Sequence, residues 1–166
     1  MGRVYSVHSE NQTLSTGSIL IALQTAATVS AGSIIRPLRV EVTQSASVTS
    51  AQARLLFSTR DTAGTLTTST VTPVNTVLGG PAGGLSGNTS VIGGTARIGI
   101  TSTADSGGAY TNHFTHSFNV LNGMLYLPVP EERFIIPPST VWCVRFATAP
   151  ASTTGWNCLF CYEEVN

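Results

Sequence analysis

Two cysteines near the end of the sequence have the spacing that metal clips and redox dithiols use. Cys158 and Cys161 form a Cys-x-x-Cys within WNCLFCYEEVN, and Cys143 is the third cysteine of the chain. The same stretch predicts a β-strand, in which residues three apart point to opposite faces. A strand would keep the two thiols from gripping one metal or closing an easy disulfide, and no second ligand pair completes a zinc site. We expect three reduced thiols that pack as small apolar residues.

Two histidines are the next candidates for metal chemistry. His113 and His116 lie in HFTHSFNV, which alternates like a strand. Their odd separation predicts opposite faces, whereas a cupin-like metal site needs two histidines on one face and a glutamate downstream. We expect His116, which stands between Phe114 and Phe118, to be a core or interface histidine.

Glu131 and Glu132 resemble a carboxylate pair for acid–base chemistry. They follow Pro130 in an expected loop, where neighbouring side chains diverge, so solvated or arginine-paired acids are the favoured interpretation. The sequence contains no Gly-x-Ser-x-Gly elbow, phosphate-binding glycine loop or His-Glu-x-x-His motif. We therefore predict no enzyme, no cofactor, and no catalytic or metal-binding residues. A metal-dependent cupin-like enzyme is an alternative that bound metal would reveal.

The elements that position these residues are predicted to be β-strands. Period-two alternation recurs along the chain, and no stretch of helical length shows an apolar stripe. In PLRVEVT, for example, Leu38, Val40 and Val42 alternate with Arg39 and Glu41. This is the pattern of an antiparallel strand with one buried face.

Other stretches repeat this pattern. QARLLFSTR predicts a core face of Ala53, Leu55 and Phe57 and an outer face of Arg54, Ser58 and Arg60. HFTHSFNV sends Phe114, His116, Phe118 and Val120 to one side, and STVWCVRFA does the same with Trp142, Val144 and Phe146. Roughly eight short strands separated by turn signals predict an all-β fold. We expect a jelly-roll or related antiparallel β-sandwich that forms a single domain over residues 1–166.

Two regions depart from the strand rhythm. Residues 1–16 become polar after Val7 and predict an extended N-terminal arm, which could pair with the sheet edge of a neighbouring copy. Residues 62–108 are rich in Thr, Ser and Gly, and a loop of that length inside a domain is uncommon. We expect it to be a long crossing or protruding segment with two weak strands, ordered by its neighbours.

The composition excludes several classes of partner. Eight basic residues, all arginine, balance eight acidic residues. We therefore expect no net electrostatic attraction between the chain and nucleic acid or anionic lipid. The apolar stretch over residues 18–31 is too short and too polar to span a membrane. Trp142 and Trp156 fall on predicted core faces, which leaves Tyr110 as the one aromatic residue of the Gly-rich loops that could stack on a sugar.

Three stretches together resemble a known family. They are MGRVYSVHSENQTLSTG, PLRVEVTQSASVTSAQARLLFSTR and HSFNVLNGMLYLPVPEERFIIPPSTVWCVRFATAPAS, with turn markers at residues 119–123 and in LPVPEERFIIPP. They resemble small β-proteins encoded among the head genes of tailed bacteriophages. Such proteins are similar to the jelly-roll decoration, or cement, proteins that bind the outside of an icosahedral capsid as trimers.

The resemblance implies a structural role on the virion. The chain would be made in the host cytoplasm and would then bind the outer surface of the capsid. There a homotrimer would contact the major capsid protein and bridge its neighbouring subunits, and the family has no catalytic residues to carry over. The alternative function is a phage tail or fibre component, or another carbohydrate-binding β-sandwich module, that recognises host-surface glycans.

Overall fold

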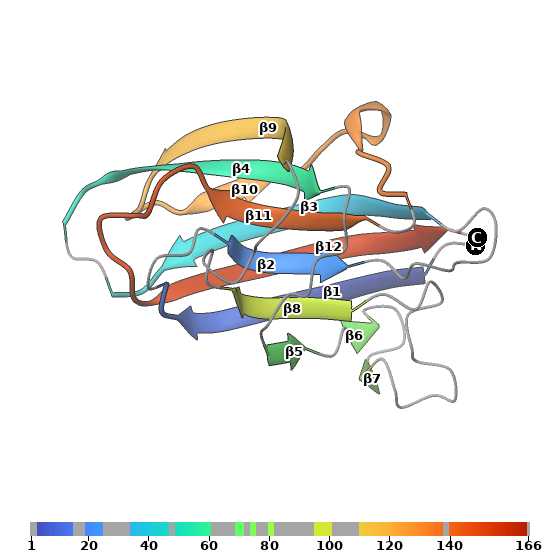
Figure 1. Ribbon diagram of the computed structural model, residues 1–166, viewed down its shortest axis with the longest axis horizontal. Helices are drawn as coiled ribbons and strands as arrows, with labels where there is room; N and C mark the ends of the chain where they lie inside the picture. Colours follow the sequence, from blue (N-terminus) through green and yellow to red (C-terminus); the bar gives the residue numbers. More distant parts are fainter. Residues whose placement is uncertain are drawn as a thin grey trace.

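The computed structural model describes residues 3–14, 19–24, 34–46, 49–60, 69–71, 74–75, 80–81, 95–100, 110–137 and 140–165. These residues form twelve β-strands in two six-stranded antiparallel sheets, which pack as a sandwich (Figure 1). One 3-10 turn, η2 (Pro130–Glu132), is also present in these ranges. The predicted all-β sandwich is confirmed.

Each sheet combines strands from both halves of the sequence. Sheet A has the order β10 (Met124–Tyr126), β3 (Ile34–Gln44), β12 (Trp156–Val165), β1 (Arg3–Gln12), β6 (Val74–Asn75) and β7 (Gly80–Pro81). Sheet B has the order β5 (Ser69–Val71), β8 (Thr95–Ile100), β2 (Ile19–Gln24), β11 (Val141–Phe146), β4 (Gln52–Arg60) and β9 (Tyr110–Asn119).

Eight of these strands form a jelly roll. Without β5 to β8, sheet A reads β1-β12-β3-β10 and sheet B reads β2-β11-β4-β9. Successive strands of these eight therefore alternate between the sheets, except that β4 and β9 are both in sheet B, which is the winding of two Greek keys. The first and last strands are neighbours, with Tyr5 opposite Tyr162 and Val7 opposite Phe160.

The other four strands come from the connection between β4 and β9. β8 pairs with β2, and β6 pairs with β1, so the inserted strands extend both sheets. Figure 1 shows them together on the side of the sandwich away from β9 and β10. They occupy part of the expected loop region 62–108, the rest of which lies outside the described residues.

Aromatic rings from both sheets fill the space between them. Trp142 of β11 stacks on Phe160 of β12 with ring centroids 4.5 Å apart, and Trp156 packs edge-on to Phe146 at 4.6 Å. Both tryptophans are fully buried, as predicted. The core faces predicted for β4 and β11 are confirmed, because their inward residues all belong to one buried cluster: Ala53, Leu55, Phe57, Trp142, Val144 and Phe146.

The N-terminal segment is part of the sandwich instead of a free arm. Residues 3–12 form β1, which pairs with β12 on one side and with β6 on the other. Leu14 is also buried, and its amide donates to the carbonyl of Thr153 at 2.7 Å. The expectation of an extended arm is therefore wrong for residues 3–14, since this segment already pairs with β12 and ends in a hydrogen bond to Thr153 within the chain.

One detail of the predicted alternation is also wrong. A bulge pairs Cys161 with Arg39 and the next residue, Tyr162, with Pro37, so Leu38 leaves the regular inward register and is only half-buried. On β4, Ser58 and Arg60 face outward yet are buried. The outer side of sheet B carries a second small buried cluster there, formed by Ile19, Ala22, Val141 and Cys143.

Candidate interaction surface

The cysteines occupy separate environments as free thiols. Cys158 is buried between the sheets, whereas Cys161 is half-buried on the outer side of β12. The predicted separation of this pair across a strand is confirmed. Burial raises the pKa of all three thiols, and that of Cys143 rises to about 12. Thiols of this kind stay protonated at neutral pH and react slowly.

The histidines lie at the edge of sheet B. His113 and His116 are both exposed on β9, the last strand of that sheet in the described order. The His113 ring lies 5.2 Å from that of Phe134, and its Nε2 is 2.7 Å from Thr59 Oγ1. The His116 ring lies 6.0 Å from that of Phe114. Of the two positions expected for His116, the core is wrong, because an edge strand leaves its ring in solvent, and the interface stays a prediction.

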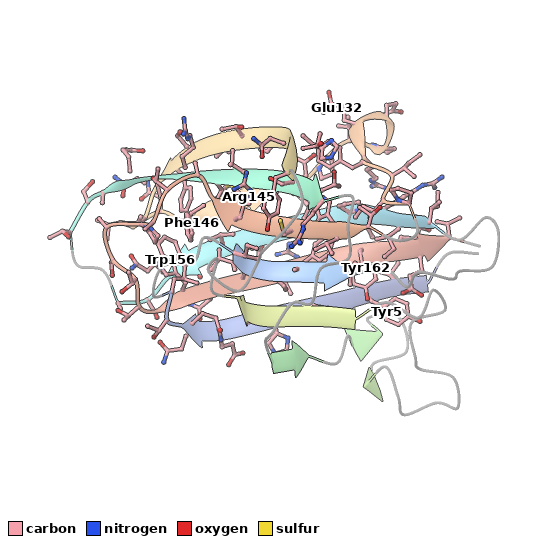
Figure 2. All side chains as sticks on the ribbon, in the orientation of Figure 1. Tyr5, Glu132, Arg145, Phe146, Trp156 and Tyr162 are labelled. Atoms are coloured by element: carbon pink, nitrogen blue, oxygen red, sulfur yellow. The ribbon has the colours of Figure 1, made fainter. Side chains whose placement is uncertain are left out.

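The two glutamates lie in the turn η2. Figure 2 shows Glu132 on the loop that projects beyond β9 and β10. Glu131 and Glu132 are exposed, and within the described ranges neither forms an ion pair. The same ranges contain no group of three or more His, Cys, Asp or Glu side chains placed to hold a metal ion. The acids are therefore solvated side chains of a projecting turn.

Large apolar side chains are exposed around β10. Each of the five is between 51% and 61% exposed: Leu121, Leu125, Leu127, Val129 and Ile135. We call this group the β10 edge, because it runs from the β9–β10 turn, through β10, to the segment after η2. Single exposed apolar residues are ordinary, but several along one edge of a sheet are typical of a surface that another protein covers.

The β10 edge rests on a well-packed layer of rings. Tyr126 of β10 lies 4.8 Å from both Phe57 of β4 and Phe114 of β9, and 6.4 Å from Phe134, measured between ring centroids. These contacts join the edge strand of sheet A to the edge strand of sheet B. The exposed residues therefore stand on a closed side of the sandwich that packing holds in place.

A second surface feature, which we call the Arg145 cluster, lies on the outer side of sheet B. It contains Arg145 of β11, Ser58 of β4, and Asn112 and Tyr110 of β9 (Arg145 is labelled in Figure 2). Arg145 Nε donates to Ser58 Oγ at 3.0 Å, and Nη2 donates to Asn112 Oδ1 at 2.9 Å. The guanidinium carbon lies 4.4 Å from the centroid of the Tyr110 ring. One cation is thus held by three strands.

The outer side of sheet A carries a shallow depression of about 400 Å³. His8, Glu10, Glu41, Asn157 and Leu159 are among its lining residues. Its polar groups already interact with the chain: His8 lies 3.7 Å from Glu10, Glu41 pairs with Arg39, and Asn157 accepts a hydrogen bond from the Asn11 amide at 2.8 Å. The depression therefore offers few polar groups to a ligand.

The sequence did not point to either surface feature. The stretch LPVPEERFIIPP has apolar residues next to prolines, which is the one local signal for the β10 edge. Tyr110 was considered as a sugar-stacking residue, but Arg145 covers one face of its ring. Ser58 and Asn112 carry no recognisable motif, since the cluster depends on which strands are neighbours.

Comparisons with protein-family models, with curated proteins and with solved structures give no match for this chain. Within its described residues, no helix has the length and apolar character needed to cross a membrane. The surface features themselves are therefore the guide to function.

Proposed function

We propose that the chain is a capsid decoration protein of a tailed bacteriophage. In this function it binds the outer surface of the head as a homotrimer and bridges neighbouring subunits of the major capsid protein. The observation that carries the proposal is the β10 edge, with five large apolar side chains exposed along one side of a rigid sandwich. Covering such a surface removes apolar area from water and favours association.

The jelly-roll fold agrees with this function without deciding it, because the same fold serves in viral capsid proteins, lectins and cupins. The mechanism would be multivalent. Each protomer contributes a modest contact area, and a trimer that engages several capsid subunits at once dissociates slowly. The protein would stabilise the shell by linking subunits, with no chemical turnover.

The proposal is tested by mixing the purified chain with undecorated mature heads of the phage that encodes it, followed by cosedimentation. We expect the chain to pellet with the heads at a fixed, saturable stoichiometry. Full recovery of the chain in the supernatant would overturn the proposal. If the chain instead bound host-surface glycans on a glycan array, the tail or fibre function would replace the decoration function.

A further inference from the structure

Arg145 is held in position by uncharged groups of the described residues. Its hydrogen-bond partners, Ser58 Oγ and Asn112 Oδ1, are uncharged, and the Ser58 hydroxyl itself donates to the same Asn112 oxygen at 2.8 Å. In the part of the chain that the structure describes, Arg145 forms no ion pair. The side chain is only partly buried. Because three strands already fix the guanidinium, a carboxylate that reaches it would meet an ordered, bidentate donor.

The turn η2 carries carboxylates that form no ion pair with any residue the structure describes. Glu131 and Glu132 are adjacent and exposed, and Arg133 beside them forms no ion pair in the described ranges. Val129 and Ile135 flank the turn and are 52% and 59% exposed. The turn therefore presents two negative charges to solvent, with an exposed apolar side chain on either side.

These two features belong to different sides of one molecule. The turn leaves the edge of sheet A, to which the chain returns where Ile136 bridges Ile35 of β3. Arg145 faces outward from the middle of sheet B, where β11 lies between β2 and β4. Figure 2 shows Glu132 projecting away from the sandwich and well apart from Arg145. Among the residues that the structure describes, no ion pair joins Glu131 or Glu132 to Arg145, so the two complementary groups of one chain are not paired with each other.

We propose that the Glu131–Glu132 turn of one copy docks against the Arg145 cluster of a second copy. The inference rests on the homotrimer of the proposed function and names the contact that builds it. Because the two surfaces differ, the contact is head-to-tail, and it forms the closed ring of the homotrimer when the rotation from each copy to the next closes. The formal net charge of zero means that copies do not repel one another before the contact forms.

Charge exchange tests the contact directly. The full chain and its variants are measured by sedimentation velocity over a range of concentrations. We expect the unmodified chain to assemble, and Arg145→Glu to weaken assembly at least tenfold because it places like charges together. The double variant Glu131→Arg, Glu132→Arg should show the same loss. Combining all three substitutions restores opposite charges and should recover assembly.

Two controls separate this contact from general effects. Arg36→Glu reverses a half-buried arginine on β3 in sheet A and should leave assembly unchanged. If Arg145→Glu unfolds, the exposed pair Glu131→Gln, Glu132→Gln supplies the test, with circular dichroism to confirm the fold. The inference would be overturned if the unmodified chain were monomeric. It would also be overturned if a folded variant with only Arg145 or only the two glutamates changed assembled normally, or if the triple variant did not assemble.

The charge-exchange test of this contact and the cosedimentation test of the proposed function can fail independently. If the charge exchange fails while the unmodified chain still pellets with capsids, the inference falls and the decoration function stands. If the charge exchange succeeds while no variant binds capsids, the contact between copies stands and the decoration function falls.

Discussion

The indole of Trp142 and the phenyl ring of Phe160 stack across the two sheets at a centroid distance of 4.5 Å, with 19° between their planes. Phe57 extends this stack on the other side of Trp142 at 5.6 Å. Sheet A and sheet B thus meet through rings supplied by β12, β11 and β4. Stacked rings in a buried position contribute both area and geometry to the packing of the sandwich.

Phe160→Ala removes the ring from sheet A that Trp142 contacts. We expect the free energy of unfolding to fall by about 3–5 kcal/mol, from lost burial and the cavity left behind. Chemical denaturation followed by tryptophan fluorescence measures this change. The neighbouring Leu159→Ala, on the half-buried outer face, is the matched control and should cost less than half as much. Equal losses for the two variants would contradict the assignment of faces on β12.

Stability should decrease at alkaline pH because of the buried thiols. Burial raises the pKa of Cys143 from 9.0 to about 12. Between these values the unfolded chain releases the proton and the folded chain keeps it, so stability is complete below pH 9 and is lost as pH rises toward the folded pKa. The slope from this group is about 1.4 kcal/mol per pH unit.

The contribution of Cys143 appears as a difference between two proteins. Denaturation is measured from about pH 8 to about pH 11 for the unmodified chain and for Cys143→Ala. We expect the free energy of unfolding of the variant to decline less steeply with pH, by the slope that the release of one proton contributes. Cys158 has a raised pKa for the same reason and should give the same result when replaced. Parallel curves for variant and unmodified chain would exclude a raised thiol pKa.

The three cysteines should differ in reactivity. Cys161 is half-buried, whereas Cys143 and Cys158 are buried. A thiol reagent added to the native chain at neutral pH should modify Cys161 first, and more slowly than a free cysteine because burial raises its pKa too. Mass spectrometry after digestion locates the modification, and all three should react in denaturant. Early modification of Cys158 would show that the sandwich opens at β12.

Gly155 should not tolerate a side chain. Its φ is +74°, and a Cβ there would lie 2.6 Å from Ala46 Cβ and 2.8 Å from the Ala46 nitrogen. We expect Gly155→Ala to lower the free energy of unfolding by about 1–3 kcal/mol, since an L-residue is strained at this φ and the backbone must also move. The exposed Ala151→Gly in the same connection is a control with an expected change of roughly 0.5 kcal/mol or less.

The β10 edge should contribute to binding and not to folding. The triple variant Leu125→Asn, Val129→Asn, Ile135→Asn should bind capsids at least about tenfold more weakly, because it makes the proposed contact polar. Its unfolding midpoint should stay near that of the unmodified chain, since these side chains are more than half exposed. Thr148→Asn with Ala149→Asn, both exposed on the β11–β12 connection, should leave both measurements unchanged.

Alternation was sufficient to find the main strands, because a period of two residues is a local property of the chain. Phe57, Trp142 and Trp156 could be assigned to the core from their own neighbours in sequence. The bulge at Leu38 could not be predicted, since a single extra residue in a ladder leaves no mark in the alternation. Neither could the burial of Ser58 and Arg60, which depends on what lies above the outer face of sheet B.

The surface features depend on which strands are neighbours. Arg145 and Ser58 are 87 residues apart in sequence, and Arg145 and Asn112 are 33 apart. Their contact exists only because β4 lies between β9 and β11 in sheet B. Exposure of the β10 edge similarly follows from the position of β10 at the margin of sheet A. Composition and periodicity contain neither fact.

The position of β12 also governs when the molecule can form. This strand is the last of the twelve described, yet it lies in the interior of sheet A, with β3 on one side and β1 on the other. During synthesis the earlier strands must wait for residues 156–165 before the sheet can close. Pairing between segments so distant in sequence is slow. We therefore expect the nascent chain to be susceptible to proteolysis and prone to aggregation until that strand has left the ribosome.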